Sequence, residues 1–257
     1  MKRSLFAIAL ATLLGALVIE YWQTEPPAAP PVPTPIVQAP VPAADAPPAI
    51  QHPVAPPPAT AHPLPELDDS DQALGAELAQ LMGVQALPGF FYPDRMIRRL
   101  VATVDNLPRR RLAMQLMPLR PVPGSFTVTA APERIAPANA VRYRLYVEAL
   151  EAVDPAALVE VYARFYPLFQ QAYVELGYPH GYFNDRLIEV LDMLLAAPDQ
   201  ASAAKLVRPS VMYKFSDAGL EALSAGEKIL LRMGEDNARR VKASLHAIRD
   251  ELLRRVP

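Results

Sequence analysis

Apolar residues recur at helical spacing through most of the chain from residue 66 onward. In the clearest case, Asp154 and Pro155 place a helix-capping side chain before the residue favoured at the first helical position. The apolar positions that follow cover most of the circumference of a helix, which is typical of a helix in the middle of a bundle. Because the ring of Pro167 opposes the carbonyl of Ala163, we expect the helix to kink or break there. The apolar positions are Leu158, Val161, Tyr162, Phe165, Phe169, Ala172 and Leu176.

Three helices are predicted before this segment. The first is capped at Asp68–Ser70 and ends at Gly83. The second opens at Pro93-Asp94 and extends to Val104. The third is expected from Asn106-Leu107-Pro108 to Met117, where a group of prolines ends it.

Two stretches between these helices and the central one are less regular. Residues 141–147 alternate like a strand, but Asn139 as a cap and the continuation to Glu151 favour a helix. Ser125–Thr129 alternates apolar and polar residues and is expected to be a short extended piece.

Three more helices are predicted in the C-terminal part. Asn184-Asp185 is interpreted as the cap of a helix that ends before Pro198. Ser224 and Glu227 have the spacing of a capping box, in which each side chain accepts from the backbone of the other. The last helix carries a narrow apolar stripe, which either packs on its own bundle or pairs two copies of the chain. The stripe consists of Val241, Leu245, Ile248 and Leu252.

These patterns predict an all-α fold, a bundle of about seven to nine helices.

The N-terminal part of the chain does not show the pattern of a globular domain. Lys2 and Arg3 precede an apolar stretch, and Ser4 to Trp22 spans about nineteen residues, enough for one transmembrane helix. The segment Pro26–Pro65 holds sixteen of the 30 prolines and almost no charge, so it is expected to remain an extended, disordered linker.

The predicted organisation is therefore a transmembrane anchor at residues 1–22, a Pro/Ala-rich linker at 23–65 and a globular helical domain at 66–257. A cleaved secretory signal begins similarly, but no small-x-small site follows the apolar stretch, which favours an uncleaved anchor. Positive charge lies before the stretch, so the positive-inside rule keeps the N-terminus in the cytoplasm and places the domain outside.

Composition excludes several kinds of chemistry. The chain has no cysteine, which excludes disulfides and cysteine-ligated metals, and its formal net charge of −2 argues against nucleic acid as the main partner. The sequence contains no zinc-binding HExxH, no GxSxG elbow, no phosphate-binding glycine loop and no dinucleotide fingerprint. We therefore expect no catalytic residue, no metal and no cofactor.

Five segments of the domain carry a family resemblance. They are Asn106-Leu107-Pro108, Pro118-Leu119-Arg120-Pro121, Tyr166–Tyr173, Tyr182–Arg186 and Lys228–Gly234. Together they resemble an uncharacterised family of bacterial envelope proteins, with a domain of unknown function behind an N-terminal anchor. The resemblance covers nearly all of the domain and implies a bacterial source and membrane anchoring, but it assigns no reaction.

Two candidate binding surfaces stand out. In the turn Gly177–Arg186, tyrosine faces at Tyr178 and Tyr182 lie beside the polar groups of His180, Asn184 and Asp185, a combination suited to a sugar or a peptide. Alternatively, the tyrosines pack beneath the turn and Asn184 or Asp185 simply caps the helix.

The second surface is rich in arginine. Arg109, Arg110 and Arg111 form a triplet at the start of a predicted helix, where the dipole disfavours positive charge, so a role in binding carboxylates or phosphates is one interpretation. The other is an internal network of ion pairs or a solvated face.

The leading functional hypothesis is a non-enzymatic binding or scaffold module of the bacterial cell envelope. It is expected to sit in the inner membrane through one helix, with the C-terminal domain in the periplasm, and to bind an envelope protein or a cell-wall polymer. The alternative is an envelope hydrolase or glycan-modifying enzyme that uses carboxylates and His180.

Overall fold

The computed structural model describes residues 49–55, 63–82, 87–130, 133–199 and 204–256. The predicted anchor and most of the predicted linker lie outside these residues. Within them the structure is mostly helical, which confirms the predicted fold class for the domain. No helix of the described residues is long and apolar enough to cross a membrane.

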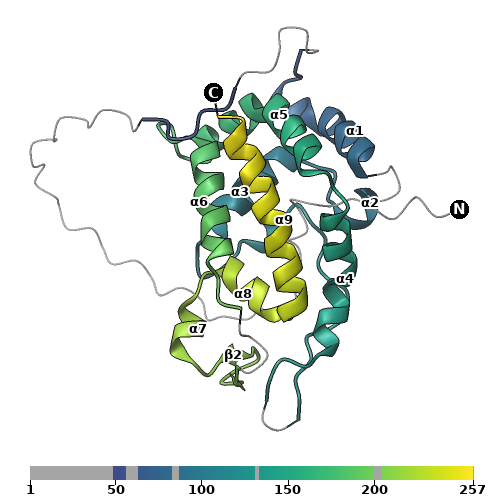
Figure 1. Cartoon of the computed structure of the whole chain (residues 1–257), viewed down its shortest axis with the longest axis vertical. Helices are drawn as coiled ribbons and strands as arrows, with labels where there is room; N and C mark the ends of the chain where they lie inside the picture. The colour runs from purple at the N-terminus through teal and green to yellow at the C-terminus, as the bar shows by residue number, and fades with distance from the viewer. Residues whose placement is uncertain (1–48, 56–62, 83–86, 131–132, 200–203, 257) are drawn as a thin grey trace, which may run out of the picture.

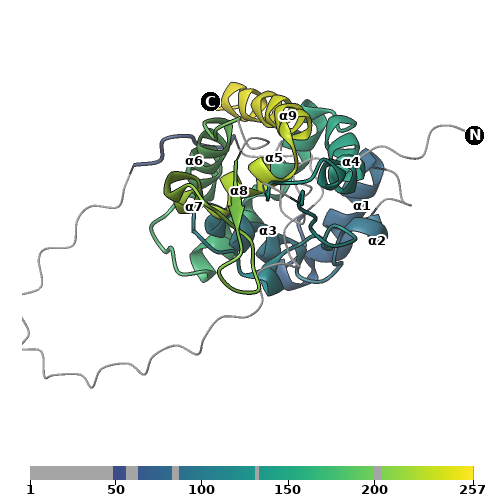
Figure 2. The same cartoon turned by 90° about the horizontal axis from the view of Figure 1, so that it is seen from below.

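The helices form a bundle around α5 (Figures 1 and 2). The N-terminal helices are α1 (Ser70–Met82), α2 (Leu87–Phe90), α3 (Met96–Asn106) and α4 (Ala138–Glu151). The middle of the chain forms α5 (Pro155–Glu175) and α6 (Phe183–Leu195). A hairpin of β1 (Leu206–Val207) and β2 (Lys214–Phe215) precedes α7 (Ala218–Ala222), α8 (Ala225–Arg232) and α9 (Glu235–Arg254).

Helix α5 lies between α3 and α9 and also contacts α1 and α6. Its ring at Phe165 is fully buried, as expected for a helix that is apolar around most of its circumference. Asp154 caps it by accepting from the backbone of Ala157 at 2.9 Å, as its sequence predicts. The helix runs unbroken through Pro167, so the predicted break is not observed.

Two other local signals are confirmed. Ser224 accepts from the backbone of Glu227 at 3.2 Å, and Glu227 accepts from the backbone of Ser224 at 2.9 Å, which completes the capping box of α8. Residues 138–151 form a helix and not a strand. The extended piece near Ser125–Thr129 pairs briefly through Val128 and Ile135.

The apolar stripe of α9 packs inside the bundle, against α4, α5, α6 and α8. Its four residues Val241, Leu245, Ile248 and Leu252 are at most 5% exposed. This stripe therefore has no exposed apolar surface left for a second copy of the chain.

The helix predicted from Asn106 to Met117 does not form. Asn106 ends α3, and only a short 3₁₀ turn occurs at Met114–Leu116. The reason is tertiary: the carbonyls of Leu107 and Arg109 accept from the backbone of Gly226 and Ala225, the first residues of α8. These carbonyls satisfy N–H groups at the start of α8 that have no partner within that helix.

Candidate functional site

A short stretch of the predicted linker lies on the domain. We call residues 49–55 the strap. Both carboxylate oxygens of Asp185, in the first turn of α6, accept from it: the backbone N–H of Gln51 donates at 3.0 Å and that of His52 at 2.7 Å. The side-chain amide of Asn184 donates to the carbonyl of His52 at 2.8 Å, and Val54 packs against the main core. The strap is thus held by the folded domain, ahead of the boundary predicted at residue 66.

This contact corrects the interpretation of Asn184 and Asp185 as a helix cap. The residue before α6 is Tyr182, whose side chain makes no capping bond. Asn184 and Asp185 lie inside the first turn and point their polar groups at the strap. Asn184 is 1% exposed and is fixed by Tyr162, whose hydroxyl donates to its side-chain oxygen at 3.0 Å.

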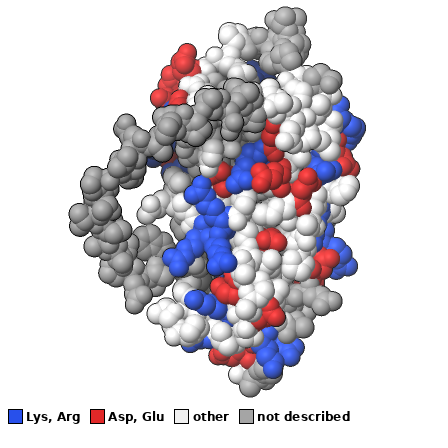
Figure 3. Space-filling model, turned by 90° about the vertical axis from the view of Figure 1, so that its left-hand side faces the viewer, with Lys and Arg blue, Asp and Glu red and all other residues white. Residues whose placement is uncertain are grey.

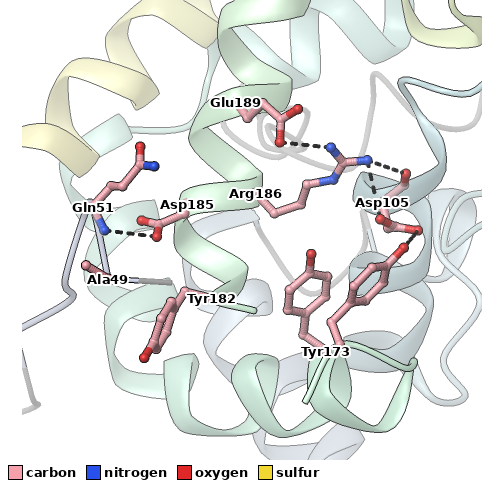
Figure 4. A pocket seen from close by; sticks show the side chains of 9 residues that line it. Ala49, Gln51, Asp105, Tyr173, Tyr182, Asp185, Arg186 and Glu189 are labelled. Carbon is pink, nitrogen blue, oxygen red and sulfur yellow. Dashed lines mark hydrogen bonds and ion pairs between the residues drawn. The ribbon is translucent and has the colours of Figure 1, made fainter. Parts of the chain in front are cut away.

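A pocket of about 480 Å³ opens between the strap, α6, the end of α3 and the turn between α5 and α6 (Figure 4). Its volume lies within the range of about 300–1,000 Å³ that is usual for small-molecule sites. We call it the tyrosine pocket. Its walls are formed by Ala49, Gln51, Asp105, Tyr173, Tyr178, Tyr182, Asp185, Arg186 and Glu189.

Asp105, at the end of α3, organises one wall. Its carboxylate is only 2% exposed and accepts from Arg109 at 2.6 Å and from the hydroxyl of Tyr178 at 3.1 Å. Arg186 pairs with the other oxygen at 3.4 Å and extends to Glu189 at 2.8 Å (Figure 4). Buried carboxylates need such partners, because an unpaired charge in this environment is costly. The ion pairs therefore fix α3, α6 and the turn relative to each other.

The aromatic wall is equally well fixed. The rings of Tyr173 and Tyr178 stack with centroids 4.5 Å apart and planes 15° apart. Gly181 approaches this pair so closely that a Cβ there would lie 2.9 Å from the Tyr173 ring, and Gln170 holds the turn by donating to the carbonyl of Gly181 and accepting from Phe183. Burial raises the pKa of Tyr173 to about 12.

The pocket brings together three of the candidates from the predicted turn: Tyr178, Tyr182 and Asp185. Asn184 lies behind the strap, whereas His180 is exposed and does not line the pocket. The alternative that tyrosines pack beneath the turn holds for Tyr178, although its hydroxyl binds Asp105 instead of the backbone.

The arginine-rich region resolves mainly into ion pairs within the domain. Arg98 pairs with Asp68 at 2.9 Å and with Glu175, Arg99 pairs with Asp94 at 2.8 Å, and Arg109 belongs to the Asp105 network. Figure 3 shows acidic and basic side chains next to each other on part of one face, beside a contiguous basic patch. Arg110 and Arg111 are exposed in the turn after α3. The triplet does not open a helix, so the argument from an unfavourable helix dipole does not apply.

Sequence reasoning missed Asp105, Tyr173, Arg186 and Glu189, as well as the two strap residues. Asp105 had a usable signal, because it is a carboxylate that directly follows the buried run Leu100–Val104 on α3. A charge in such a position is seldom buried without a partner. The strap had no comparable signal, because its three hydrogen bonds use only its backbone.

The described residues contain no group of three or more His, Asp or Glu side chains that could hold a metal ion. A search with protein-family models identifies residues 96–249 as a domain described as "Protein of unknown function (DUF3014)". The chain belongs to this family. The match covers α3 to most of α9, and therefore the helices that build the tyrosine pocket. No curated protein and no solved structure matches the chain significantly.

Proposed function

We propose that this chain is a non-enzymatic binding module of the bacterial cell envelope, with the tyrosine pocket as its binding site. The supporting observation is the pocket itself, which is lined both by tyrosine side chains and by charged groups. Such a site suits one unit of a cell-wall polymer or a side chain of an envelope protein, because aromatic rings offer stacking faces while polar groups fix orientation.

The carboxylates of the pocket already have hydrogen-bond and ion-pair partners, which favours binding over catalysis. Asp105 is occupied by two guanidinium groups and a phenol, and both oxygens of Asp185 are occupied by the strap. A general acid or base has to reach the reacting group at hydrogen-bond distance, and His180 lies outside the pocket wall. Glu189, the third carboxylate of the pocket wall, pairs with Arg186. The hydrolase alternative therefore lacks a positioned pair of catalytic groups at this pocket.

The proposed location rests on the sequence. Lys2 and Arg3 before the apolar stretch suit a single inner-membrane helix with the domain in the periplasm. The chain has no native cysteine, so one introduced at Ala59 reports location cleanly. In intact cells with a permeable outer membrane, a membrane-impermeant maleimide should label this cysteine and leave a cysteine at Ser4 unlabelled. Labelling of neither position, or of Ser4 alone, would contradict the proposed topology.

Tyr182 offers the sharpest test of the binding site. It lines the pocket, it is partly exposed, and its side chain does not cap α6. We expect purified cell-wall sacculi to bind the wild-type chain, and Tyr182→Ala to weaken sedimentation with them by about tenfold, the loss expected for one aromatic contact of roughly 1–1.5 kcal/mol.

The controls are Tyr182→Phe, which keeps the ring, and Val211→Ala, which truncates an exposed side chain in the β1–β2 hairpin. Both should bind like the wild type. If sacculi bind equally well to Tyr182→Ala, the pocket is not the polymer site. If they do not bind the wild type, the polymer part of the proposal is wrong.

A further inference from the structure

Side chains in the first turn of α6 bind the backbone of the strap. Asp185 accepts two successive N–H groups, from Gln51 and His52, and Asn184 donates to the carbonyl of His52. The two side chains face the strap, which bends at Gln51 and His52, with two acceptors and a donor. Asn184 is held in this orientation by the buried Tyr162. We call the surface formed by Asn184 and Asp185 the docking groove.

Few features of the strap sequence are needed for this contact. The residues at positions 51 and 52 must supply backbone N–H groups, so neither can be proline. Pro53 restricts the backbone of the residue before it, His52, whose carbonyl accepts from Asn184. Val54 packs against the core. The docking groove therefore accepts a segment of the form X-X-Pro-Val, in which each X is any residue except proline, and Gln-X-Pro-Val meets this requirement.

The same pattern occurs a second time in the chain. Ile50-Gln51-His52-Pro53-Val54 lies in the strap, and Val37-Gln38-Ala39-Pro40-Val41 lies thirteen residues earlier. Both begin with a β-branched residue, and both have Gln, Pro and Val at the same positions. Only the third residue differs in kind, and its described contacts to the groove are made by its backbone.

We propose that the docking groove is a peptide-binding site for Gln-X-Pro-Val, with two competing segments of the same chain as its ligands: Gln51–Val54, as in the structure, and Gln38–Val41. Chain length permits the exchange. Eight residues join Val54 to Pro63, and 21 residues would join Val41 to Pro63. Loop-closure scaling then favours the nearer segment by about fourfold at equal intrinsic affinity, so the farther one is a populated minor state.

The exchange changes two properties of the protein. Docking of Gln38–Val41 shortens the free N-terminal part by thirteen residues, which is on the order of 40 Å in the extended conformation of proline-rich chains. It also removes Ala49 and Gln51 from the pocket wall, which they line when the strap is docked. The groove thus couples the reach of the domain to the shape of the tyrosine pocket. This coupling does not depend on what the pocket binds.

The test uses the full-length chain in detergent micelles with ¹⁵N-glutamine labelling, which reports the amides of Gln38 and Gln51 directly. In the wild type, exchange of the Gln51 amide with solvent should be slow, because it donates to Asp185, and that of Gln38 should be fast. The variant Gln51→Pro/His52→Pro removes both strap donors. In it, the Gln38 amide should exchange about tenfold more slowly than in the wild type, as expected for a hydrogen bond to a charged acceptor.

Two matched variants complete the test. Gln38→Pro/Ala39→Pro should leave the exchange of Gln51 slow, and Asp185→Ala added to Gln51→Pro/His52→Pro should return Gln38 to fast exchange. The proposal is overturned if Gln38 exchanges equally fast in the wild type and in Gln51→Pro/His52→Pro. It is also overturned if slow exchange of Gln38 depends on protein concentration, because the ligand would then come from a second copy, or if it persists without Asp185.

Discussion

Asp105→Ala is the perturbation that best probes the wall of the tyrosine pocket. The carboxylate is 2% exposed and has three partners, so its removal leaves the Tyr178 hydroxyl without its acceptor and takes one partner from the Arg186 guanidinium, which keeps Glu189 and the backbone carbonyl of residue 105. Breaking a buried ion pair by removing one partner typically costs about 3–5 kcal/mol. Because the Arg186 side chain is 20% exposed and keeps Glu189, we expect the lower end, about 3 kcal/mol.

Urea unfolding followed by circular dichroism measures this loss. With a slope of about 2 kcal/mol per molar urea, a loss of about 3 kcal/mol lowers the midpoint by about 1.5 M. Tyr178→Phe removes one hydrogen bond to a charged acceptor and should cost about 1.5 kcal/mol. Since both changes break the same bond, the double variant should lose about 1.5 kcal/mol less than the sum of the single losses.

Arg109→Ala is the matched comparison, because the Arg109 side chain is 56% exposed and the buried Asp105 carboxylate keeps Arg186 and Tyr178 as partners. It should cost clearly less than Asp105→Ala. A loss below about 1 kcal/mol for Asp105→Ala, or strict additivity with Tyr178→Phe, would refute the idea that this carboxylate ties α3 to the turn.

Three further predictions concern stability. Ser224→Ala removes half of the capping box and should cost about 1 kcal/mol in urea unfolding. The control Ser244→Ala, inside α9, removes no helix cap and should cost much less. Gly234→Ala should cost more than about 1 kcal/mol, because φ is +91° there and the added Cβ would lie 3.2 Å from the Cβ of Ala140; an unchanged midpoint would contradict the strain argument. Burial raises the pKa of Tyr173 to about 12 in the folded chain, from an ordinary value of 10.0. Between these pH values the folded chain binds more protons than the unfolded chain, so the free energy of unfolding should fall as pH rises from about 10 to 12. The fall should be less steep in Tyr173→Phe.

Local chemistry made much of the fold predictable. Asp154 and Ser224 cap helices by contacts that span three residues. The apolar stripe of α9 correctly predicts which face of that helix is buried. The failures have distant causes. Residues 107–109 do not continue as a helix because their carbonyls bind α8, more than a hundred residues later. Sequence periodicity contains no information on such a partner.

In the candidate site, too, local features could be predicted from the sequence and distant contacts could not. A tyrosine-rich turn was visible in the sequence, but Asn184 looked like a cap and proved to bind His52, 132 residues away. The strap could not be recognised because it lies within a proline-rich segment of the kind typical of linkers, and because its hydrogen bonds use the backbone. The second copy of Gln-X-Pro-Val becomes informative only once the first copy is seen bound to the docking groove.

The most direct measurement of the central claim is site-specific photocrosslinking from the tyrosine pocket in intact cells. A photoreactive residue replaces Tyr182 in the full-length chain, and a matched chain carries it at Val211, which is 55% exposed outside the pocket. The account predicts that a cell-wall fragment or a single envelope protein is captured from position 182 and not from position 211. Equal capture from both positions, or none from position 182, would contradict the assignment of the pocket as the binding site.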